Sequence, residues 1–468
     1  MTRQDVSDND RGLKIVLINP PAEKVRESHD LPGYPHSGLG YLAAYLNQKG
    51  IPADVIDAKL ERLSGNDVIQ RIEGRGYGLA GLTAMTHDIV NAAGLAAGIK
   101  KAIPGITTVI GGVHATALPQ DTLSDFSSFD ILVYGEGEIT LYELVDCLQN
   151  RNSCTEIKGI AFRDGDTITI NPPRPKIENL DELPFPDLAK YPECKEYHII
   201  TSRGCPFRCI FCMSPYGRDK IRERSPQNVI SELKDIERHR PRLIKFNDET
   251  FGFNKARASE LLDSIVANGL QHTKKVASLR VDIVTLPLLQ KMKEAGFFYI
   301  DYGIESGNPD ILKKIKKGIT REQAEKAIRL TKDAGIRAGA NFIIGHPGET
   351  MQTAMETVDF AVKLNADVNA IGLMVPYPGT EVARMAQKGE GGYKLLSFDW
   401  SDYNKQIGNA LELETLSRRQ MERLQLKAYL KILTGNRRYY DLVKFFLINR
   451  RSGAAFLKKM IAGRRKKD

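Results

Sequence analysis

Two stretches of the chain alternate short apolar runs with helical patterns, and this alternation limits the fold more than any other feature. In the first stretch, strands are predicted at 14–19, 53–57, 78–85, 107–111 and 130–134, and helices at 39–49, 67–73, 88–103 and 140–148. Strands that alternate with helices at this interval indicate an α/β domain built on a doubly wound parallel sheet. In such sheets, ligands bind beyond the carboxyl ends of the strands.

The second stretch predicts further strands at 198–201, 243–249, 275–281, 298–305, 338–345 and 369–375. Helical patterns join them in turn, at 227–238, 255–267, 287–295, 321–334 and 350–364. Strands joined in this way predict a partial (β/α)6 barrel. The polar residues that follow these strands are then expected at its carboxyl-end face, where barrels carry their sites.

Three of the six cysteines, Cys205, Cys209 and Cys212, lie within eight residues directly after the strand at 198–201. Soft thiolates this close together suit an iron–sulfur cluster or a zinc ion. No fourth cysteine or histidine lies nearby at a standard spacing, and intervals of three and then two residues are not those of a zinc finger. Three ligands to a four-iron cluster would leave one iron open to a small molecule. Chance cysteines or a structural zinc site are the alternatives.

The pattern Cys-x3-Cys-x-Phe-Cys resembles the radical SAM family, whose open iron binds S-adenosylmethionine (SAM). The resemblance implies a [4Fe–4S] cluster on the three cysteines, with Phe211 near the adenine of SAM. Polar residues at the later strand ends match the family pattern in order. By this resemblance they are Asn247, Asp248 and Glu249 toward the methionyl amino group, Arg280 toward the methionyl carboxylate, Glu305 and Ser306 toward the ribose, and Gly345 beside the adenine. A helix N-cap or a surface salt bridge is the alternative for each acidic residue.

The loops that follow the strands of the first stretch contain several glycines. Their layout resembles the cobalamin-binding Rossmann domain, which is often fused in front of a radical SAM barrel. Glycine lets the backbone approach a flat corrin or its nucleotide tail, although tight strand–helix turns also need glycine. The residues that the resemblance assigns to cobalamin are Thr83, Thr86, Gly111, Gly112, His114, Gly135, Glu136 and Gly137.

One departure from this family concerns the cobalt ion. Members that ligate cobalt from below use an Asp-x-His-x-x-Gly loop after the first strand, whereas residues 19–23 here contain no histidine. The resemblance therefore does not imply a lower cobalt ligand from this loop. His87 and His114 lie on candidate loops, and we interpret both as hydrogen-bonding loop residues rather than cobalt ligands.

These patterns divide the chain into four parts. We predict a cobalamin-binding domain at 13–150, a hairpin and proline-rich linker at 151–195, a radical SAM barrel at 196–390 and a helical basic region at 391–468. The hairpin is predicted from the alternation around the turn at 163–166.

The net charge of +9 is unevenly distributed along the chain. Residues 418–468 contain 16 Lys/Arg and 3 Asp/Glu, so this tail carries +13 and the remainder −4. Basic residues that alternate with apolar ones can lie on an anionic membrane surface. A solvated helical cap and binding of an anionic substrate are alternatives, and nucleic acid is disfavoured. The polar start and the absence of any long apolar run predict a cytoplasmic protein, with attachment to the inner face of the membrane left open.

The resemblance also implies a reaction. In the family, an electron donor such as flavodoxin or ferredoxin reduces the cluster, SAM is cleaved to methionine and a 5′-deoxyadenosyl radical, and the radical takes hydrogen from an unactivated carbon. Relatives that use cobalamin can then transfer a methyl group. We predict C-methylation of a small-molecule or lipid-like substrate. The alternatives are a radical cyclase with the same cofactors and a cobalamin sensor with a vestigial barrel.

Overall fold

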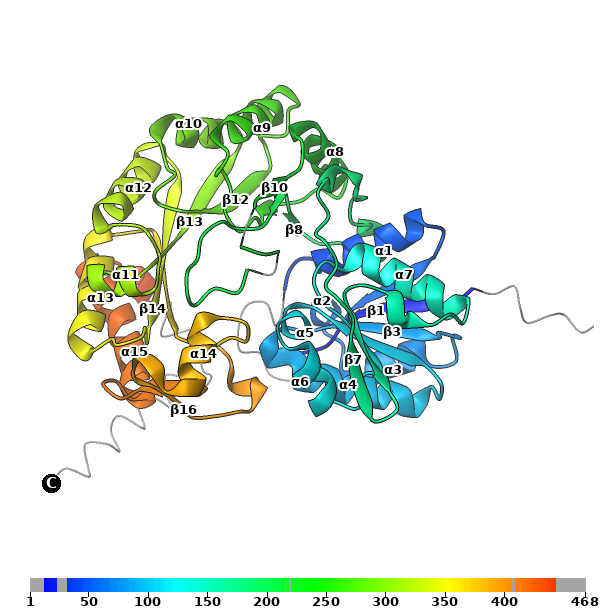
Figure 1. The fold of residues 1–468 in the computed structure, drawn as a ribbon. Helices are drawn as coiled ribbons and strands as arrows, with labels where there is room; N and C mark the ends of the chain where they lie inside the picture. Colours follow the sequence, from blue (N-terminus) through cyan, green and yellow to red (C-terminus); the bar gives the residue numbers. More distant parts are fainter. Residues whose placement is uncertain (1–11, 23–31, 215, 219, 406–408, 443–468) are drawn as a thin grey trace, which may run out of the picture.

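The computed structural model describes residues 12–22, 32–214, 216–218, 220–405 and 409–442. Two α/β domains lie side by side, with the curved sheet of the second domain opening toward the first (Figure 1). The loop after β9 (Ser202–Arg203) runs inside that curve.

The first domain is built on a seven-stranded sheet in the order β2-β1-β3-β4-β5-β6-β7. Its parallel strands are β1 (Ile15–Asn19), β2 (Ala53–Asp57), β3 (Leu79–Thr83), β4 (Thr107–Gly111) and β5 (Ile131–Val133). The predicted hairpin, β6 (Ile160–Asp164) and β7 (Thr167–Ile170), pairs antiparallel with β5 and so extends this sheet rather than standing apart as a linker. The predicted α/β fold is confirmed.

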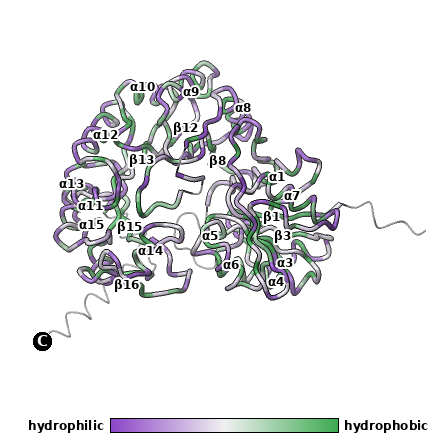
Figure 2. The backbone as a smooth tube through the Cα atoms, in the orientation of Figure 1, coloured by the Kyte–Doolittle hydropathy of each residue, from purple (hydrophilic) through white to green (hydrophobic). Residues whose placement is uncertain are grey.

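Helices cover both faces of the first sheet. On one face lie α1 (Ser37–Gln48) and α7 (Gly137–Gln149), and on the other lie α3 (Gly65–Ile72) and α4 (Ile89–Ala102). Strand β1 shows why both faces are buried: Ile15 and Leu17 pack toward α1 and α7, while Val16 and Ile18 pack toward α3 and α4. Hydrophobic residues accordingly gather along β1 and β3 (Figure 2). Two short helices that the sequence did not predict, α5 (Val113–Ala117) and α6 (Pro119–Asp125), follow β4.

The second domain has a six-stranded parallel sheet in the order β15-β14-β13-β12-β11-β8. Its strands are β8 (Glu196–Ile199), β11 (Leu243–Phe246), β12 (Lys274–Leu279), β13 (Phe297–Glu305), β14 (Arg337–Ile344) and β15 (Val368–Leu373). The helices that join them are α8 (Pro226–Glu237), α9 (Lys255–Ala267), α10 (Leu286–Glu294), α12 (Arg321–Asp333) and α13 (Met351–Leu364). They cover the convex side of the sheet (Figure 1), as the predicted partial barrel requires.

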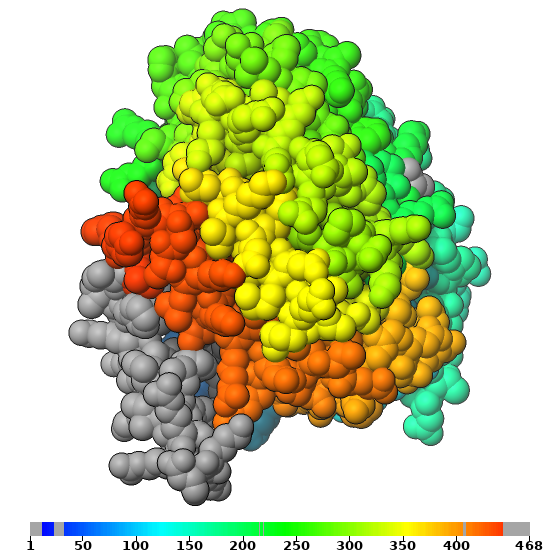
Figure 3. Space-filling model, turned by 90° about the vertical axis from the view of Figure 1, so that its left-hand side faces the viewer, coloured from blue at the N-terminus to red at the C-terminus, as the bar shows by residue number. Residues whose placement is uncertain are grey.

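The chain continues beyond the barrel through α14 (Glu381–Lys388), the strand pair β16 (Tyr393–Leu395) and β17 (Leu411–Leu413), and α15 (Arg418–Gly435). Helix α15 buries Met421, Leu424 and Ala428, and it lies on the outer surface beside α13 (Figure 3). The basic tail prediction for 443–468 lies outside the described residues. None of the helices in the described part of the chain is long and apolar enough to cross a membrane.

Candidate functional site

The cysteine loop is closed at its base by two short strands. Strands β9 (Ser202–Arg203) and β10 (Arg222–Glu223) pair antiparallel and bring the two ends of the loop together. Gly204 begins the loop with a φ of +100°, and a Cβ there would lie 2.5 Å from the backbone oxygen of Lys220. Only glycine fits both constraints, so the residue before Cys205 is fixed by backbone crowding.

The three thiols differ in exposure along the loop. Cys209 is buried, Cys205 is half-buried and Cys212 is exposed. Burial raises the pKa of the Cys209 thiol, while the positive charges of Lys317 and Arg280 oppose that rise. In the described residues, no group of three His, Cys, Asp or Glu side chains converges on a point that would hold one metal ion.

Arg280 follows β12 and lies against the cysteine loop. Its guanidinium stands 3.5 Å from the ring centre of Phe207, within cation–π range. Nε and Nη2 donate to the two carboxylate oxygens of Asp282 at 3.0 and 2.9 Å. Nη2 also donates to the backbone oxygen of Lys317 at 2.9 Å. These contacts fix the guanidinium beside the cysteines.

Glu305 ends β13 in a left-handed conformation, with a φ of +73°. Its carboxylate accepts a hydrogen bond from Lys317 Nζ at 2.9 Å, and both side chains are about nine-tenths buried. Its backbone oxygen accepts from His346 Nε2 at 3.2 Å. The His346 ring lies 6.1 Å from the ring of Phe211. The predicted residues Arg280, Glu305 and Phe211 are therefore brought together around Lys317, which sequence reasoning missed.

Buried polar atoms without a hydrogen-bond partner in the described chain include Glu249 Oε2 and His346 Nδ1, together with Arg218 Nη2 on the cysteine loop, Arg222 Nε at its base and Glu349 Oε1 in the turn after β14. Burial lowers the pKa of His346 to about 4 and raises that of Glu249. Buried polar groups normally find partners. Orphan atoms at the end of a barrel are those expected where a polar ligand completes the site.

Two of the predicted SAM-binding residues are engaged within the protein instead. Both oxygens of Asp248 accept hydrogen bonds from the segment before the cysteine loop, namely from Thr201 N and Thr201 Oγ1 at 2.6 Å and from Ser202 N at 3.1 Å. Ser306 is fully buried, and its hydroxyl contacts Thr357 Oγ1 at 3.1 Å and accepts from Asn308 N. These side chains fasten loops, whereas Asn247 is exposed at the end of β11.

The turn after β14 is built around Gly345. It has a φ of +102°, and its amide donates to Glu349 Oε2 at 2.6 Å. Its carbonyl accepts from Tyr393 Oη at 3.1 Å. Glu349 is fully buried, and burial raises the pKa of its carboxyl to about 7.

The predicted cobalamin loops of the first domain lie side by side. The amide of Ala84 donates to the oxygen of Gly111 at 3.2 Å, and the amide of His114 donates to the oxygen of Ala84 at 3.4 Å. Gly112 has a φ of +98°, and a Cβ there would lie 2.8 Å from Thr83 Oγ1 and from the oxygen of Ala84. We call this close approach of the loops after β3 and β4 the glycine crossing. Thr86 is buried and begins the short helical turn Thr86–Asp88 that follows β3.

His114 is buried against a residue from the far end of the chain. Its ring packs edge-on to Trp400 with 5.0 Å between ring centres, and Nδ1 has no partner among the described residues. Burial lowers the pKa of His114 to about 4, so the imidazole is neutral. Trp400 is the only tryptophan of the chain, and nothing in its local sequence indicated this contact.

Glu136 does not face the open side of its loop. Its carboxylate binds Arg222 through both oxygens, at 2.8 and 2.9 Å, and also accepts from Arg203 and from the amide of Ile177. Glu138 binds Arg203 at 2.6 Å. All four charged side chains are at least 94% buried. We call Glu136, Glu138, Arg203 and Arg222 the interdomain quartet.

The quartet joins the two predicted cofactor regions. Glu136 and Glu138 lie on the glycine loop at the start of α7, between Gly135 and the body of the helix. Arg203 and Arg222 are the paired residues at the base of the cysteine loop. Sequence reasoning assigned Glu136 to cobalamin and missed the other three, because their pairing depends on the docking of two domains.

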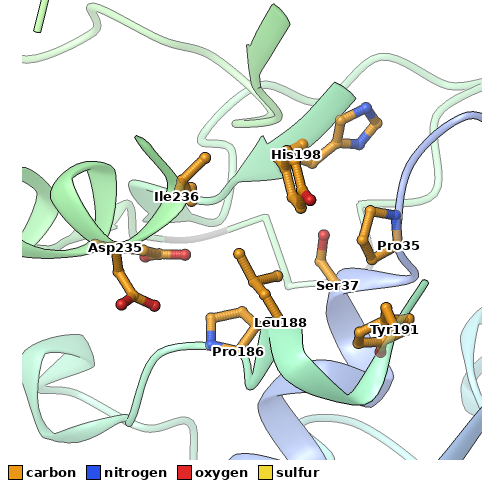
Figure 4. Close-up of a pocket in the computed structure, with 10 residues that line it drawn as sticks. Pro35, Ser37, Pro186, Leu188, Tyr191, His198, Asp235 and Ile236 are labelled. Atoms are coloured by element: carbon orange, nitrogen blue, oxygen red, sulfur yellow. The ribbon is translucent and has the colours of Figure 1, made fainter. Parts of the chain in front are cut away.

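A small cavity also lies between the domains, lined by Pro35, Ser37, Leu188, Tyr191 and His198 among others (Figure 4). Its volume is about 10 Å³, which is room for about one water molecule. It is therefore part of the packed interface and not a substrate site.

Comparisons with known proteins agree with this arrangement. The Radical SAM superfamily model matches residues 199–361, and the B12 binding domain model matches residues 32–145. An uncharacterized methyltransferase from Pyrococcus horikoshii is 33% identical over 428 residues, which cover 89% of this chain and 92% of the relative. The chain belongs to the cobalamin-binding radical SAM family.

Two further proteins are similar to this cobalamin-binding radical SAM protein. The anaerobic magnesium-protoporphyrin IX monomethyl ester cyclase of Rubrivivax gelatinosus is 31% identical over 392 residues, covering 79% of this chain and 69% of the relative. The radical S-adenosylmethionine methyltransferase TsrM of Kitasatospora setae, solved with cobalamin and a [4Fe–4S] cluster, has the same fold: the TM-score is 0.73 at 18% identity, over 89% of this chain and 91% of that one.

The cobalamin-binding radical SAM protein is an enzyme, as predicted, and the predicted cofactor set of a [4Fe–4S] cluster, SAM and cobalamin is confirmed by the two family models. The residues present fit these groups. Three soft thiols stand on one loop beside two cations, an oxygen of Glu249 there has no partner among the described residues, and Gly112 lets the loops after β3 and β4 pack closely in the first domain.

Proposed function

We propose that this enzyme methylates an unactivated carbon of a small-molecule or lipid-like substrate. The observation that carries the proposal is the interdomain quartet. Because Glu136 and Glu138 bind the base of the cysteine loop, the loop region assigned to cobalamin and the one assigned to the cluster adjoin each other. Methylation requires a methyl group and a substrate radical to meet at one place, and the adjacency of these two loop regions supports the proposal.

Within this proposal, the chain holds each cofactor with separate residues. The cluster is bound by Cys205, Cys209 and Cys212. SAM is bound by Phe211, Asn247, Glu249, Arg280, Glu305 and the backbone of Gly345, and cobalamin by Thr83, Thr86, Gly111, Gly112, His114, Gly135 and Gly137. When bound, these groups supply one-electron chemistry and a carried methyl group.

The protein's own part is positioning and electrostatics. The guanidinium of Arg280 already binds Asp282 through Nε and Nη2, so Nη1 is the group that remains for a ligand carboxylate, and the charge of the guanidinium adds to that binding. Lys317 places a second positive charge beside Cys209 and the ring of Phe211. The orphan oxygen of Glu249 is an acceptor for an ammonium group.

The test uses the anaerobically reconstituted enzyme with hydroxocobalamin, a reductant, SAM labelled with CD3 and a panel of deuterated candidate substrates. Methylation consumes one SAM as methyl donor and one as radical source. We therefore expect S-adenosylhomocysteine and 5′-deoxyadenosine in equal amounts, CD3 in the product, and substrate deuterium in 5′-deoxyadenosine. Deuterated 5′-deoxyadenosine without S-adenosylhomocysteine would contradict methylation.

That last outcome would instead favour the second candidate, a radical cyclase. Its support is the similarity to the cyclase of Rubrivivax gelatinosus, which is 31% identical over 79% of this chain. Both reactions need the cluster, so the product ratio, and not loss of activity in cysteine variants, separates them.

Two partners complete the proposal. The cluster needs an external electron, for which a small acidic carrier such as flavodoxin or ferredoxin is suited. The basic tail, with 16 Lys/Arg after Ser417, is suited to an anionic membrane surface and therefore to a lipid-like substrate.

A further inference from the structure

The concave face of the barrel sheet carries a polar group at mid-strand. On β13, Ile300, Tyr302 and Ile304 belong to the hydrophobic core beneath the helices. Successive side chains of a strand point to opposite faces. Tyr299 and Asp301 therefore point away from the helices, into the curve of the barrel, where both are only half-buried.

Asp301 is held in one orientation by two neighbours. Tyr299 Oη donates to its Oδ1 at 3.0 Å, and Asn341 Nδ2 donates to its Oδ2 at 2.7 Å. Each oxygen keeps a further lone pair for another donor. Asp301 forms no ion pair with any described residue, and Arg337, the register partner of Tyr299 on β14, is exposed. The carboxylate is thus oriented by two hydrogen bonds and has no ion-pair partner among the described residues.

Gly339 provides the space in which this group lies. It is the register partner of Asp301 on β14. A Cβ at Gly339 would lie 2.0 Å from Tyr299 Oη and 2.4 Å from Asp301 Oδ1. A glycine in the interior of a strand marks a close approach. Any other residue here would displace the two side chains.

The polar group lies on the same face as the proposed SAM site. Gly303 is the next residue on this face, and a Cβ there would lie 2.5 Å from Glu305 Oε1. The carboxylate of Glu305 therefore folds back over Gly303 into the curve of the barrel. Asp301 and Glu305 are four positions apart along the strand, a backbone span of about 13 Å at 3.3 Å per residue.

We propose that Asp301, oriented by Tyr299 and Asn341 over Gly339, binds a hydrogen-bond donor group of the substrate, and a cationic ammonium group in preference to a neutral hydroxyl. The inference rests on the proposed function, because it places the substrate inside the barrel. An oriented carboxylate without an ion-pair partner binds a cation most strongly and repels an anionic group.

The test measures binding rather than turnover. Hexylammonium, hexanol and hexanoate are titrated by NMR into the anaerobic holoenzyme with SAM bound. We expect hexylammonium to bind, hexanol to bind more weakly and hexanoate not to bind. Asp301→Asn should weaken hexylammonium at least about tenfold, the loss expected for a charge-assisted hydrogen bond. The matched control is Asp263→Asn. Asp263 lies on the outer helix α9 in an exposed ion pair with Lys291, so this variant should bind hexylammonium as tightly as the parent does.

Gly339→Ala is a second, independent variant. It keeps Asp301 but displaces the tyrosine and the carboxylate, so it should also weaken hexylammonium while iron content and SAM binding stay unchanged. Equal binding of hexylammonium by the parent and by either variant, or binding of hexanoate as tight as that of hexylammonium, would overturn the proposal. Failure here leaves the ratio of S-adenosylhomocysteine to 5′-deoxyadenosine unaffected, so it is distinguishable from failure of the proposed function.

Discussion

Arg222 of the barrel domain holds Glu136 of the first domain through two hydrogen bonds of 2.8 and 2.9 Å, with 2% and 6% of the two side chains exposed. A carboxylate and a guanidinium buried this deeply stabilise a structure only when both are present, because removing one leaves an uncompensated charge. The pair and its neighbours Glu138 and Arg203 therefore fix how the two domains meet.

The first prediction concerns Glu138→Gln. This variant leaves the buried Arg203 with one carboxylate contact, the longer one to Glu136 at 3.3 Å, besides the rings of Tyr41 and Tyr216. We expect the free energy of unfolding to fall by about 3–5 kcal/mol, the usual cost of breaking a buried pair. Urea unfolding followed by circular dichroism measures it. The control is Glu178→Gln at the exposed pair with Lys220, which should leave the free energy of unfolding nearly unchanged because water screens the pair. Equal losses of unfolding free energy in the two variants would show that the buried Arg203–Glu138 pair contributes no more to stability than an exposed pair.

The second prediction concerns the cluster. Replacing Cys205, Cys209 and Cys212 together by alanine should remove the bound iron, the visible absorption and all SAM cleavage, because no other cysteine lies on the loop. Iron and sulfide analysis after anaerobic reconstitution measures this, with about four of each expected in the parent. Cys154→Ala, outside the loop, should retain the full complement. A cluster that survives in the triple variant would place its ligands elsewhere.

The third prediction concerns cobalamin. In Gly112→Ala, the new Cβ meets the backbone of Ala84 at 2.8 Å and the φ of +98° is strained, so the crossing loops must separate. We expect hydroxocobalamin binding to weaken at least about tenfold, since each 1.4 kcal/mol lost is tenfold in affinity. Gly105→Ala has a similar φ of +87° but open space around its Cβ, so it controls for backbone strain alone. Spectrophotometric titration with hydroxocobalamin compares the two variants with the parent. Equal affinities of Gly112→Ala and the parent would show that cobalamin does not bind at Gly112.

The fourth prediction concerns pH. Burial raises the pKa of Glu349 to about 7, above its value in the unfolded chain. Below the unfolded pKa both states are protonated. As the pH rises from the unfolded pKa toward 7, the carboxyl ionises in the unfolded state but not in the folded state. The free energy of unfolding therefore falls over this pH range, and the whole loss is present above pH 7. At about 1.4 kcal/mol per pKa unit, the total is about 3 kcal/mol.

Urea unfolding between pH 4 and pH 8 tests this effect. Glu349→Gln cannot ionise, so its unfolding free energy should fall less than that of the parent across this range. Parallel curves for the two proteins would mean that the carboxyl titrates normally.

The fifth prediction concerns the tail. If the basic residues after Ser417 hold the enzyme on a membrane, the full chain should float with anionic vesicles, and a 1–442 truncation should float less. Each basic residue near such a surface contributes about 1 kcal/mol, so flotation should fall steeply with salt and vanish on neutral vesicles. Equal flotation of both chains would make the tail a solvated extension.

The sequence by itself determined the features that are local in the chain. Short continuous apolar runs, separated by helical patterns, predicted the strands of both sheets. A parallel strand that is covered by helices is rich in apolar residues along its whole length. The spacing of Cys205, Cys209 and Cys212 indicated the family, because ligands of one cluster on one loop must be close in sequence. The hairpin at 160–170 was also recognised from its turn, although its place at the edge of the first sheet was not.

Only the tertiary structure decided which polar side chains remain open to a ligand. Asp248 and Ser306 looked equivalent to Glu249 in sequence, yet the fold satisfies the first two within loops and leaves Oε2 of Glu249 without a partner among the described residues. Glu136 and Arg222 are 86 residues apart, and their pairing exists only because two domains dock. The contact of Trp400 with His114 depends on the same docking. Burial, unlike strand propensity, is a property of what packs on a residue from elsewhere in the chain, and no local pattern encodes it.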